Sequence, residues 1–136
     1  MTITLKTKHE DLIKAAHILD SGGVVAFPTE TVYGIGADAT NSQAVKKVFA
    51  AKKRPQDNPL IVTVSDKKML SRFANINQKA EKLIKNFWPG PLTLVLTLKN
   101  KKTLPSNVTA GLSTAAFRNP INKNTREMIA LLNKPI

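Results

Sequence analysis

The 136-residue sequence contains no cysteine and only two histidines. Disulfides and thiolate metal ligands are therefore excluded, and a reducing cytoplasm is the expected setting. His9 and His17 lie in the first amphipathic segment without the spacing of metal ligands, so we expect no metal site. The sequence also lacks an apolar run long enough to span a membrane, and no secretory signal follows Met1. These absences predict a cytoplasmic protein that does not enter the membrane.

Acidic residues are scarce: the sequence has nine Asp and Glu but 21 Lys and Arg, which gives a net charge of +12. This sign favours a substrate or partner rich in phosphate. The alternative is that lysine serves solubility, and Lys79, Lys82 and Lys85 at helical spacing look like such a solvated stripe. Five other cations instead surround a proline-containing loop: Lys46, Lys47, Lys52, Lys53 and Arg54.

The hydrophobic pattern predicts one α/β domain over residues 1–136, because this length suffices for a single core. Strands are expected at 2–5, 24–27, 60–64, 92–98 and 113–117, with 24–27 fully buried and 92–98 well inside a sheet. Helices are expected at 9–21, from Asn41 or Ser42 to Lys52, from Ser65 or Asp66 through Phe73, from Asn77 to Phe87, and at 125–133. Residues 100–109 are expected to form a polar loop.

The stretch 22–36 couples the apolar run 24–27 to a glycine-rich polar turn. Polar side chains that leave the end of a buried strand are where open α/β sheets bind ligands. Gly34 and Gly36 would let the backbone approach a ligand closely. The alternative is an ordinary threonine-rich loop.

The loop that begins at Lys52 contains two prolines and no apolar residue before Leu60, so it cannot belong to the core. Lys52 and Arg54 could together supply a point charge and a bidentate fork for phosphate. Their spacing alone is a weak signal. The standard nucleotide fingerprints G-x-x-x-x-G-K-[ST] and G-x-G-x-x-G are both absent.

Four segments together resemble the threonylcarbamoyl-AMP synthase family of the YrdC type. They are GVVAFPTETVYGIG at 23–36, KKRPQDNPL at 52–60, WPGPLT at 88–93 and TAAFRNP at 114–120. The resemblance covers nearly the whole chain. It implies a twisted α/β sheet, mixed parallel and antiparallel, flanked by helices. It also implies an enzyme that makes threonylcarbamoyl-AMP and pyrophosphate from L-threonine, bicarbonate and ATP, for the modification of adenosine in transfer RNA (tRNA).

Position by position, the resemblance implies a threonine-binding pair, Thr31 and Arg118, with Arg118 on the threonine carboxylate. Thr29 and Tyr33 would shape the same pocket. We expect Thr31 and Arg118 to share one cavity with the cations that bind ATP.

The catalytic pair implied by the resemblance is Lys52 and Arg54, which would hold the nucleotide phosphates. Asn58 and Thr114 match positions that contact the nucleotide. Mg²⁺ would be carried by ATP rather than by a protein cage. A tRNA-modification transferase complex would use the product, and the surface cations predict salt-sensitive binding to tRNA or double-stranded RNA.

The sequence departs from the family's pattern in two places. Thr63 stands where many members have histidine, and the family continues past the final helix into a strand and a Ser-x-Asn segment. A single domain, incomplete at its C-terminal end, is therefore expected. The alternatives are a noncatalytic RNA-binding module and an inactive truncated paralogue.

Overall fold

A computed structural model describes residues 1–136, the whole chain. Its helices are α1 (His9–Asp20), α2 (Ser42–Lys52), α3 (Lys67–Ser71), α4 (Gln78–Phe87), α5 (Ser106–Thr109), α6 (Lys123–Leu132) and the 3-10 helix η1 (Lys101–Thr103). Its strands are β1 (Val25–Phe27), β2 (Gly34–Gly36), β3 (Ile61–Thr63), β4 (Thr93–Thr97) and β5 (Thr114–Arg118). No helix is long and apolar enough to cross a membrane.

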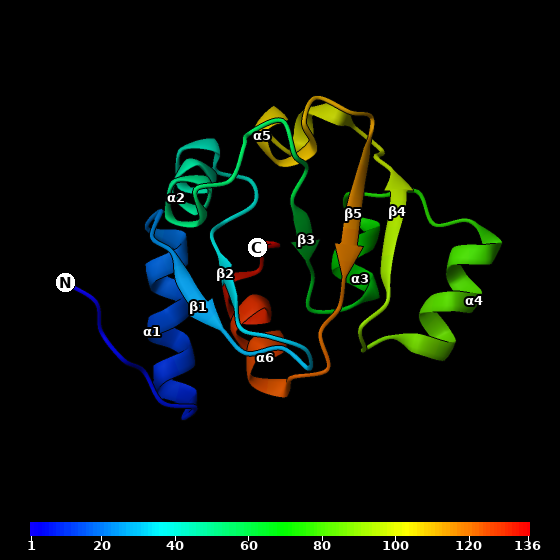
Figure 1. Ribbon diagram of the computed structural model, residues 1–136. Coiled ribbons are helices and arrows are strands. Elements are labelled where there is room, and N and C mark those ends of the chain that lie inside the picture. Colours follow the sequence, from blue (N-terminus) through cyan, green and yellow to red (C-terminus); the bar gives the residue numbers. More distant parts are fainter.

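The strands form two small sheets. In the first, β1 and β2 pair as an antiparallel hairpin; in the second, the order is β3-β5-β4, with β3 parallel and β4 antiparallel to β5. The predicted mixed α/β architecture is confirmed. Figure 1 shows the hairpin beside α1, and the three-stranded sheet between the hairpin and α4. Arg118 ends the central strand, opposite Thr63 on one side and Thr93 on the other.

The C-terminal residues lie between the two sheets (Figure 1). The backbone N–H of Ala39, after β2, donates to the carbonyl of Pro135 at 2.9 Å. Ile136 exchanges two backbone hydrogen bonds with Thr63, of 2.7 and 3.1 Å. Ile136 is buried and belongs to the main hydrophobic core, which also includes residues from α1, α6 and the three-stranded sheet. This segment therefore links the hairpin to β3.

One predicted strand is absent, and two others are present but lie elsewhere in the sheets than predicted. Residues 2–5 form no strand. The run 24–27 is not fully buried: β1 pairs only with β2, Ala26 is exposed and Phe27 is the one buried residue of the strand. The run 92–98 lies at a sheet edge, because β5 takes the central place. One face of this strand is also open to solvent, since Leu94 and Leu96 are buried while Val95 on the other face is 67% exposed.

Helix starts were predicted more accurately because their signals are local. The side chains of Asn41, Asp66 and Asn77 each accept a hydrogen bond from the first turn of the following helix, as caps do. The predicted polar loop 100–109 instead contains η1 and α5. Leu104 and Val108 are buried there, so two apolar residues dock this segment on the core.

Candidate functional site

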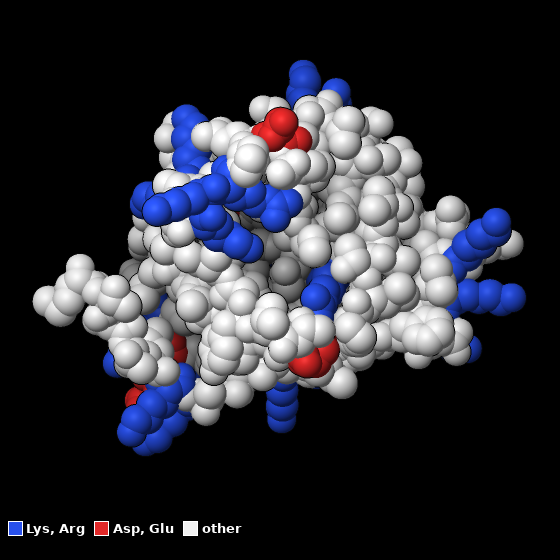
Figure 2. Space-filling model, in the orientation of Figure 1, with Lys and Arg blue, Asp and Glu red and all other residues white.

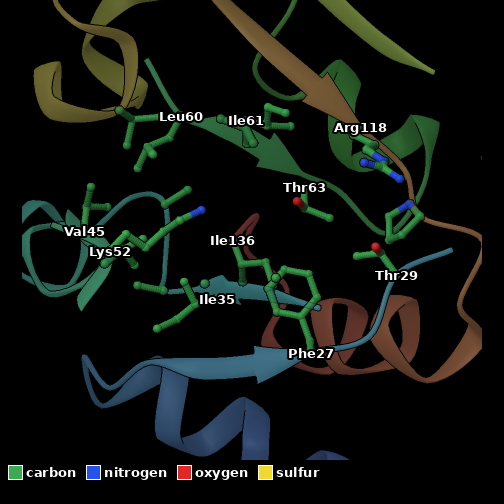
Figure 3. A pocket seen from close by; sticks show the side chains of 18 of the residues that line it. Phe27, Thr29, Ile35, Val45, Lys52, Leu60, Ile61, Thr63, Arg118 and Ile136 are labelled. Carbon is green, nitrogen blue, oxygen red and sulfur yellow. The ribbon is translucent and has the colours of Figure 1, made fainter. Parts of the chain in front are cut away.

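A cavity of about 240 Å³ lies between the hairpin and β3. We call it the inter-sheet cavity (Figure 3). Five of the residues predicted from the sequence line it: Thr29, Thr31, Lys52, Arg54 and Arg118. Their roles in binding stay predictions, but the expected convergence on one cavity is observed. Figure 3 shows Arg118 and Thr29 at one end of the cavity and Lys52 at the other, with apolar side chains between.

Arg118 forms an ion pair with Glu30, and both side chains are largely buried, at 17% and 15% exposure. Nη2 of Arg118 donates to Oε1 of Glu30 and also lies 3.3 Å from the Thr31 hydroxyl. The other carboxylate oxygen, Oε2, accepts the backbone N–H of Ile121 at 2.8 Å. Nε of Arg118 is buried and has no hydrogen-bond partner. The guanidinium is thus held from one side and retains a free donor.

Glu30 is ionised at neutral pH. Its burial acts to raise the pKa of the carboxyl group, but the hydrogen bonds from Arg118 and from the N–H of Ile121 outweigh burial, and the Arg118 charge adds to them. The net effect holds the pKa of Glu30 below its usual value. The ion pair therefore persists through the physiological range, and its net charge is close to zero.

The turn after β1 is organised by the Thr29 hydroxyl. Oγ1 of Thr29 accepts the backbone N–H groups of Thr31 at 3.3 Å and Val32 at 3.2 Å, and lies 3.1 Å from the Thr31 hydroxyl. Thr125 of α6 anchors the start of the turn by donating its hydroxyl to the carbonyl of Pro28 at 2.6 Å. These contacts place two hydroxyls and one guanidinium at the same end of the cavity.

The cations at the other end come from the end of α2. Lys52 is the last residue of this helix, and Lys53 follows in a left-handed conformation (φ 50°) that turns the chain into the loop. Nη2 of Arg54 donates to the carbonyl of Pro59 at 2.8 Å, while its Nε is buried without a partner. Figure 2 shows Lys and Arg side chains gathered beside the hollow, over α2 and this loop. Anions that enter from this side meet positive charge first.

Three predicted residues do not line the inter-sheet cavity. Tyr33 was expected to shape the pocket, but its side chain is 77% exposed because the turn directs it to solvent. Asn58 is exposed in its loop. Thr114 pairs with Thr97 at the opposite end of β5 from Arg118, about 13 Å away along a strand. Nucleotide contacts by Asn58 and Thr114 stay predictions, and they require a nucleotide that extends beyond the cavity.

Most of the cavity wall was missed by the sequence analysis because it is apolar. The additional lining residues include Phe27, Ile35, Val45, Ile61, Thr63 and Ile136. Their apolar character predicted core positions, which is what most such residues occupy. Gly34 and Gly36 line the cavity, so their expected close approach to a ligand stays a prediction, and they also have a role in packing. A Cβ at either position would lie within 3.0 Å of the Phe27 ring, so these glycines make room for that ring.

No group of three or more His, Cys, Asp or Glu residues is arranged to hold a metal ion. The chemistry available to the cavity comes instead from guanidinium, ammonium and hydroxyl groups. Such a set can bind a carboxylate at the Arg118 end and an anionic group at the Lys52 end, across an apolar middle.

Comparisons with known proteins identify the family of the chain. The Sua5–YciO–YrdC family model, described as "Telomere recombination", matches residues 17–136. The chain is 47% identical over 123 residues to threonylcarbamoyl-AMP synthase of Pyrococcus abyssi, and 50% identical over 121 residues to that of Bacillus subtilis. These alignments cover 90% and 88% of this chain but only 36% and 35% of the relatives. The chain thus spans just over a third of their length.

Solved structures show the same fold. P. abyssi Sua5 complexed with L-threonine superposes with a TM-score of 0.89 at 44% identity, over 94% of this chain and 37% of that one. E. coli YciO, at 23% identity, superposes with a TM-score of 0.82 over 94% of this chain and 62% of that one, which supports the fold alone. The family predicted from the four sequence segments is confirmed, and the chain belongs to the Sua5–YciO–YrdC family of threonylcarbamoyl-AMP synthase relatives.

Proposed function

We propose that this chain binds L-threonine and ATP and contributes to the synthesis of threonylcarbamoyl-AMP from threonine, bicarbonate and ATP, for adenosine modification in tRNA. The observation that carries the proposal is the inter-sheet cavity, where Thr31 and Arg118 face the same space as Lys52 and Arg54. The relatives named threonylcarbamoyl-AMP synthase support it, and so does the structure of P. abyssi Sua5 complexed with L-threonine. A tRNA-modification transferase would use the product.

The two ends of the cavity suit different parts of the reaction. Arg118 would bind the threonine carboxylate, with the Thr29 and Thr31 hydroxyls beside it. Lys52 and Arg54 would bind the ATP phosphates and neutralise the pyrophosphate that leaves when a carbamate oxygen of the carboxylated threonine attacks the α-phosphorus. Carboxylated threonine is a poor nucleophile, so the step depends on holding it in line with that phosphorus. Mg²⁺ would arrive with ATP and be bound mainly by phosphate oxygens.

The size of the cavity supports one arrangement of the two substrates. At about 240 Å³ it falls just below the roughly 300–1,000 Å³ typical of small-molecule sites. Threonine fits such a space, whereas ATP must extend outward past Lys52, which is exposed at the end of α2. We therefore place threonine inside the cavity and the nucleotide at its mouth.

Release of pyrophosphate tests the proposal. We expect release to require threonine, bicarbonate and ATP together, and to fall strongly in Lys52→Ala and Arg54→Ala. Lys82→Ala on α4, away from the cavity, serves as the matched control and should act like the parent protein. Release that proceeds without threonine, or a cavity that binds neither threonine nor ATP, would contradict the proposal.

A second candidate function is a noncatalytic RNA-binding module. The observation that favours it is the group of cations over α2 and the following loop, together with the net charge of +12. Such a module would bind RNA equally well with and without threonine and ATP. It would also tolerate loss of Arg118, which lies in the cavity wall rather than among the surface cations.

A further inference from the structure

Glu30 is the one charged partner of Arg118, and the proposed function gives it no role. We propose that Glu30 is a positioning residue, whose carboxylate holds the Arg118 guanidinium in the cavity wall so that its free donors face a bound carboxylate. The inference rests on the proposed function, because it assigns Arg118 to the threonine carboxylate.

Glu30 contacts Arg118 from outside the inter-sheet cavity. Arg118 lines the inter-sheet cavity and Glu30 does not. One carboxylate oxygen of Glu30 accepts from Nη2 of Arg118, and the other accepts the backbone N–H of Ile121 at 2.8 Å. The carboxylate therefore ties together the turn after β1, the end of β5 and the start of the segment that leads to α6.

This anchoring has a consequence for binding. An arginine side chain has many rotamers, and a ligand that binds a free one must restrict them. Here Nη2 is already restrained by Glu30 and lies 3.3 Å from the Thr31 hydroxyl, so the restriction is made during folding. Nε is buried without a partner, whereas Nη1 forms no hydrogen bond within the protein and is not buried, so Nη1 remains available to a ligand. A ligand carboxylate thus meets oriented donors.

Two other roles for Glu30 lead to different results. If the carboxylate only competed with the substrate for Arg118, its removal would strengthen threonine binding. If it only stabilised the fold, its removal would lower the melting temperature and leave the affinity of the folded protein unchanged. A positioning role predicts weaker binding that depends on the presence of Arg118.

A double-mutant cycle on L-threonine affinity separates these roles. The variants are Glu30→Ala, Arg118→Ala and the two combined, with Glu81→Ala as control, since Glu81 pairs with Lys67 on the surface. We expect Glu30→Ala to weaken binding roughly tenfold, and to have almost no further effect once Arg118 is absent, the behaviour of strongly coupled neighbours. The threonine affinity of Glu30→Gln should lie between those of the parent and Glu30→Ala. The glutamine has a single carbonyl oxygen, which can accept from only one of the two donors that Glu30 serves. Additive losses, or stronger binding by Glu30→Ala, would overturn the proposal.

A measurement without ligand keeps this test separate from the proposed function. We would follow the ¹⁵Nε signal of Arg118 by NMR relaxation. The order parameter should be high in the parent, low in Glu30→Ala and unchanged in Glu81→Ala. A parent protein that binds no threonine would contradict the proposed function, while the NMR result would still decide whether Glu30 holds Arg118. A mobile Arg118 in the parent would overturn the positioning role.

Discussion

Arg118 joins the two halves of the site because one guanidinium contacts a carboxylate and a hydroxyl from the turn after β1. Its backbone meanwhile lies in the middle of the three-stranded sheet, opposite Thr63 and Thr93. Arg118 is therefore held at its backbone by strand pairing and at its guanidinium by these contacts. The chemistry of this part of the cavity therefore depends on the planar, multiply donating group that arginine alone provides.

Replacing Arg118 by lysine tests this dependence. A single ammonium cannot reproduce the guanidinium fork that serves Glu30 and a ligand carboxylate together. Loss of one charge-assisted hydrogen bond, about 1.5 to 3 kcal/mol, should weaken threonine binding by roughly ten- to a hundredfold. Isothermal titration calorimetry would measure the threonine affinity of both proteins. Arg72→Lys is the matched control, since Arg72 lies over Phe73 and bonds Asn133 away from the cavity. Equal affinities of Arg118→Lys and the parent would refute the assignment.

The lowered pKa of Glu30 predicts an acid-dependent loss of stability. A carboxyl group with a depressed pKa in the folded state binds fewer protons there than in the unfolded state. Its contribution to stability is complete above the unfolded value, about 4.3, and is lost as pH falls through the folded value. Urea unfolding from pH 6 downward should show a smaller decline below this point for Glu30→Gln than for the parent. Identical declines would show that the ion pair contributes nothing to the pH dependence.

At the scale of elements, the hairpin positions Phe27 through two glycines. The ring of Phe27 lies against Gly34 and Gly36 of the paired strand, and Phe27 lines the cavity beside Ile136. Because the ring is buried, it has little room to move if a methyl group is added opposite. Gly34 and Gly36 are therefore needed for the packing of the Phe27 ring.

Gly34→Ala should consequently destabilise the protein. The new Cβ would lie 2.9 Å from Cζ of Phe27, and overpacking of this kind costs about 1 to 3 kcal/mol. Chemical unfolding would measure the loss, and the double variant Gly34→Ala with Phe27→Leu should recover part of it. Gly111→Ala serves as the comparison. A Cβ there would contact nothing, so any loss of stability would come from the backbone φ of +76°, which strains a residue with a side chain. An unchanged stability of Gly34→Ala would contradict the packing argument.

At the scale of the whole molecule, the sequence predicted what depends on neighbours in the chain and missed what depends on distant ones. Helix caps such as Asn41 and Asp66 are local, and so are the chemical motifs at Thr31 and Lys52. Strand positions are not local: nothing in the run 92–98 says that β5 will take the centre of the sheet. The Glu30–Arg118 pair joins residues 88 positions apart, so only the fold reveals it.

The distribution of charge over the molecule leads to the last prediction. The exposed cations of α2 and the following loop lie on one side of the inter-sheet cavity, and Lys82 and Lys85 lie on α4 at the other end of the molecule (Figures 1 and 2). Lys46 and Lys53 are exposed and form no ion pair. If α2 presents the RNA-binding face, these two lysines contact phosphates, whereas Lys82 and Lys85 only contribute to solubility.

Two double variants with the same change in net charge separate the alternatives. Binding of tRNA should weaken as salt rises, with a slope of log K against log salt of roughly −0.7 to −0.9 per neutralised phosphate. Lys46→Gln with Lys53→Gln should make this slope shallower by up to about two and weaken binding at low salt. Lys82→Gln with Lys85→Gln should leave the slope unchanged, because loss of net charge alone acts only at long range and is screened beyond about 10 Å at 0.1 M salt. Equal effects of the two variants would assign RNA binding to the overall charge of the protein, and a parent slope near zero would leave lysine a role in solubility alone.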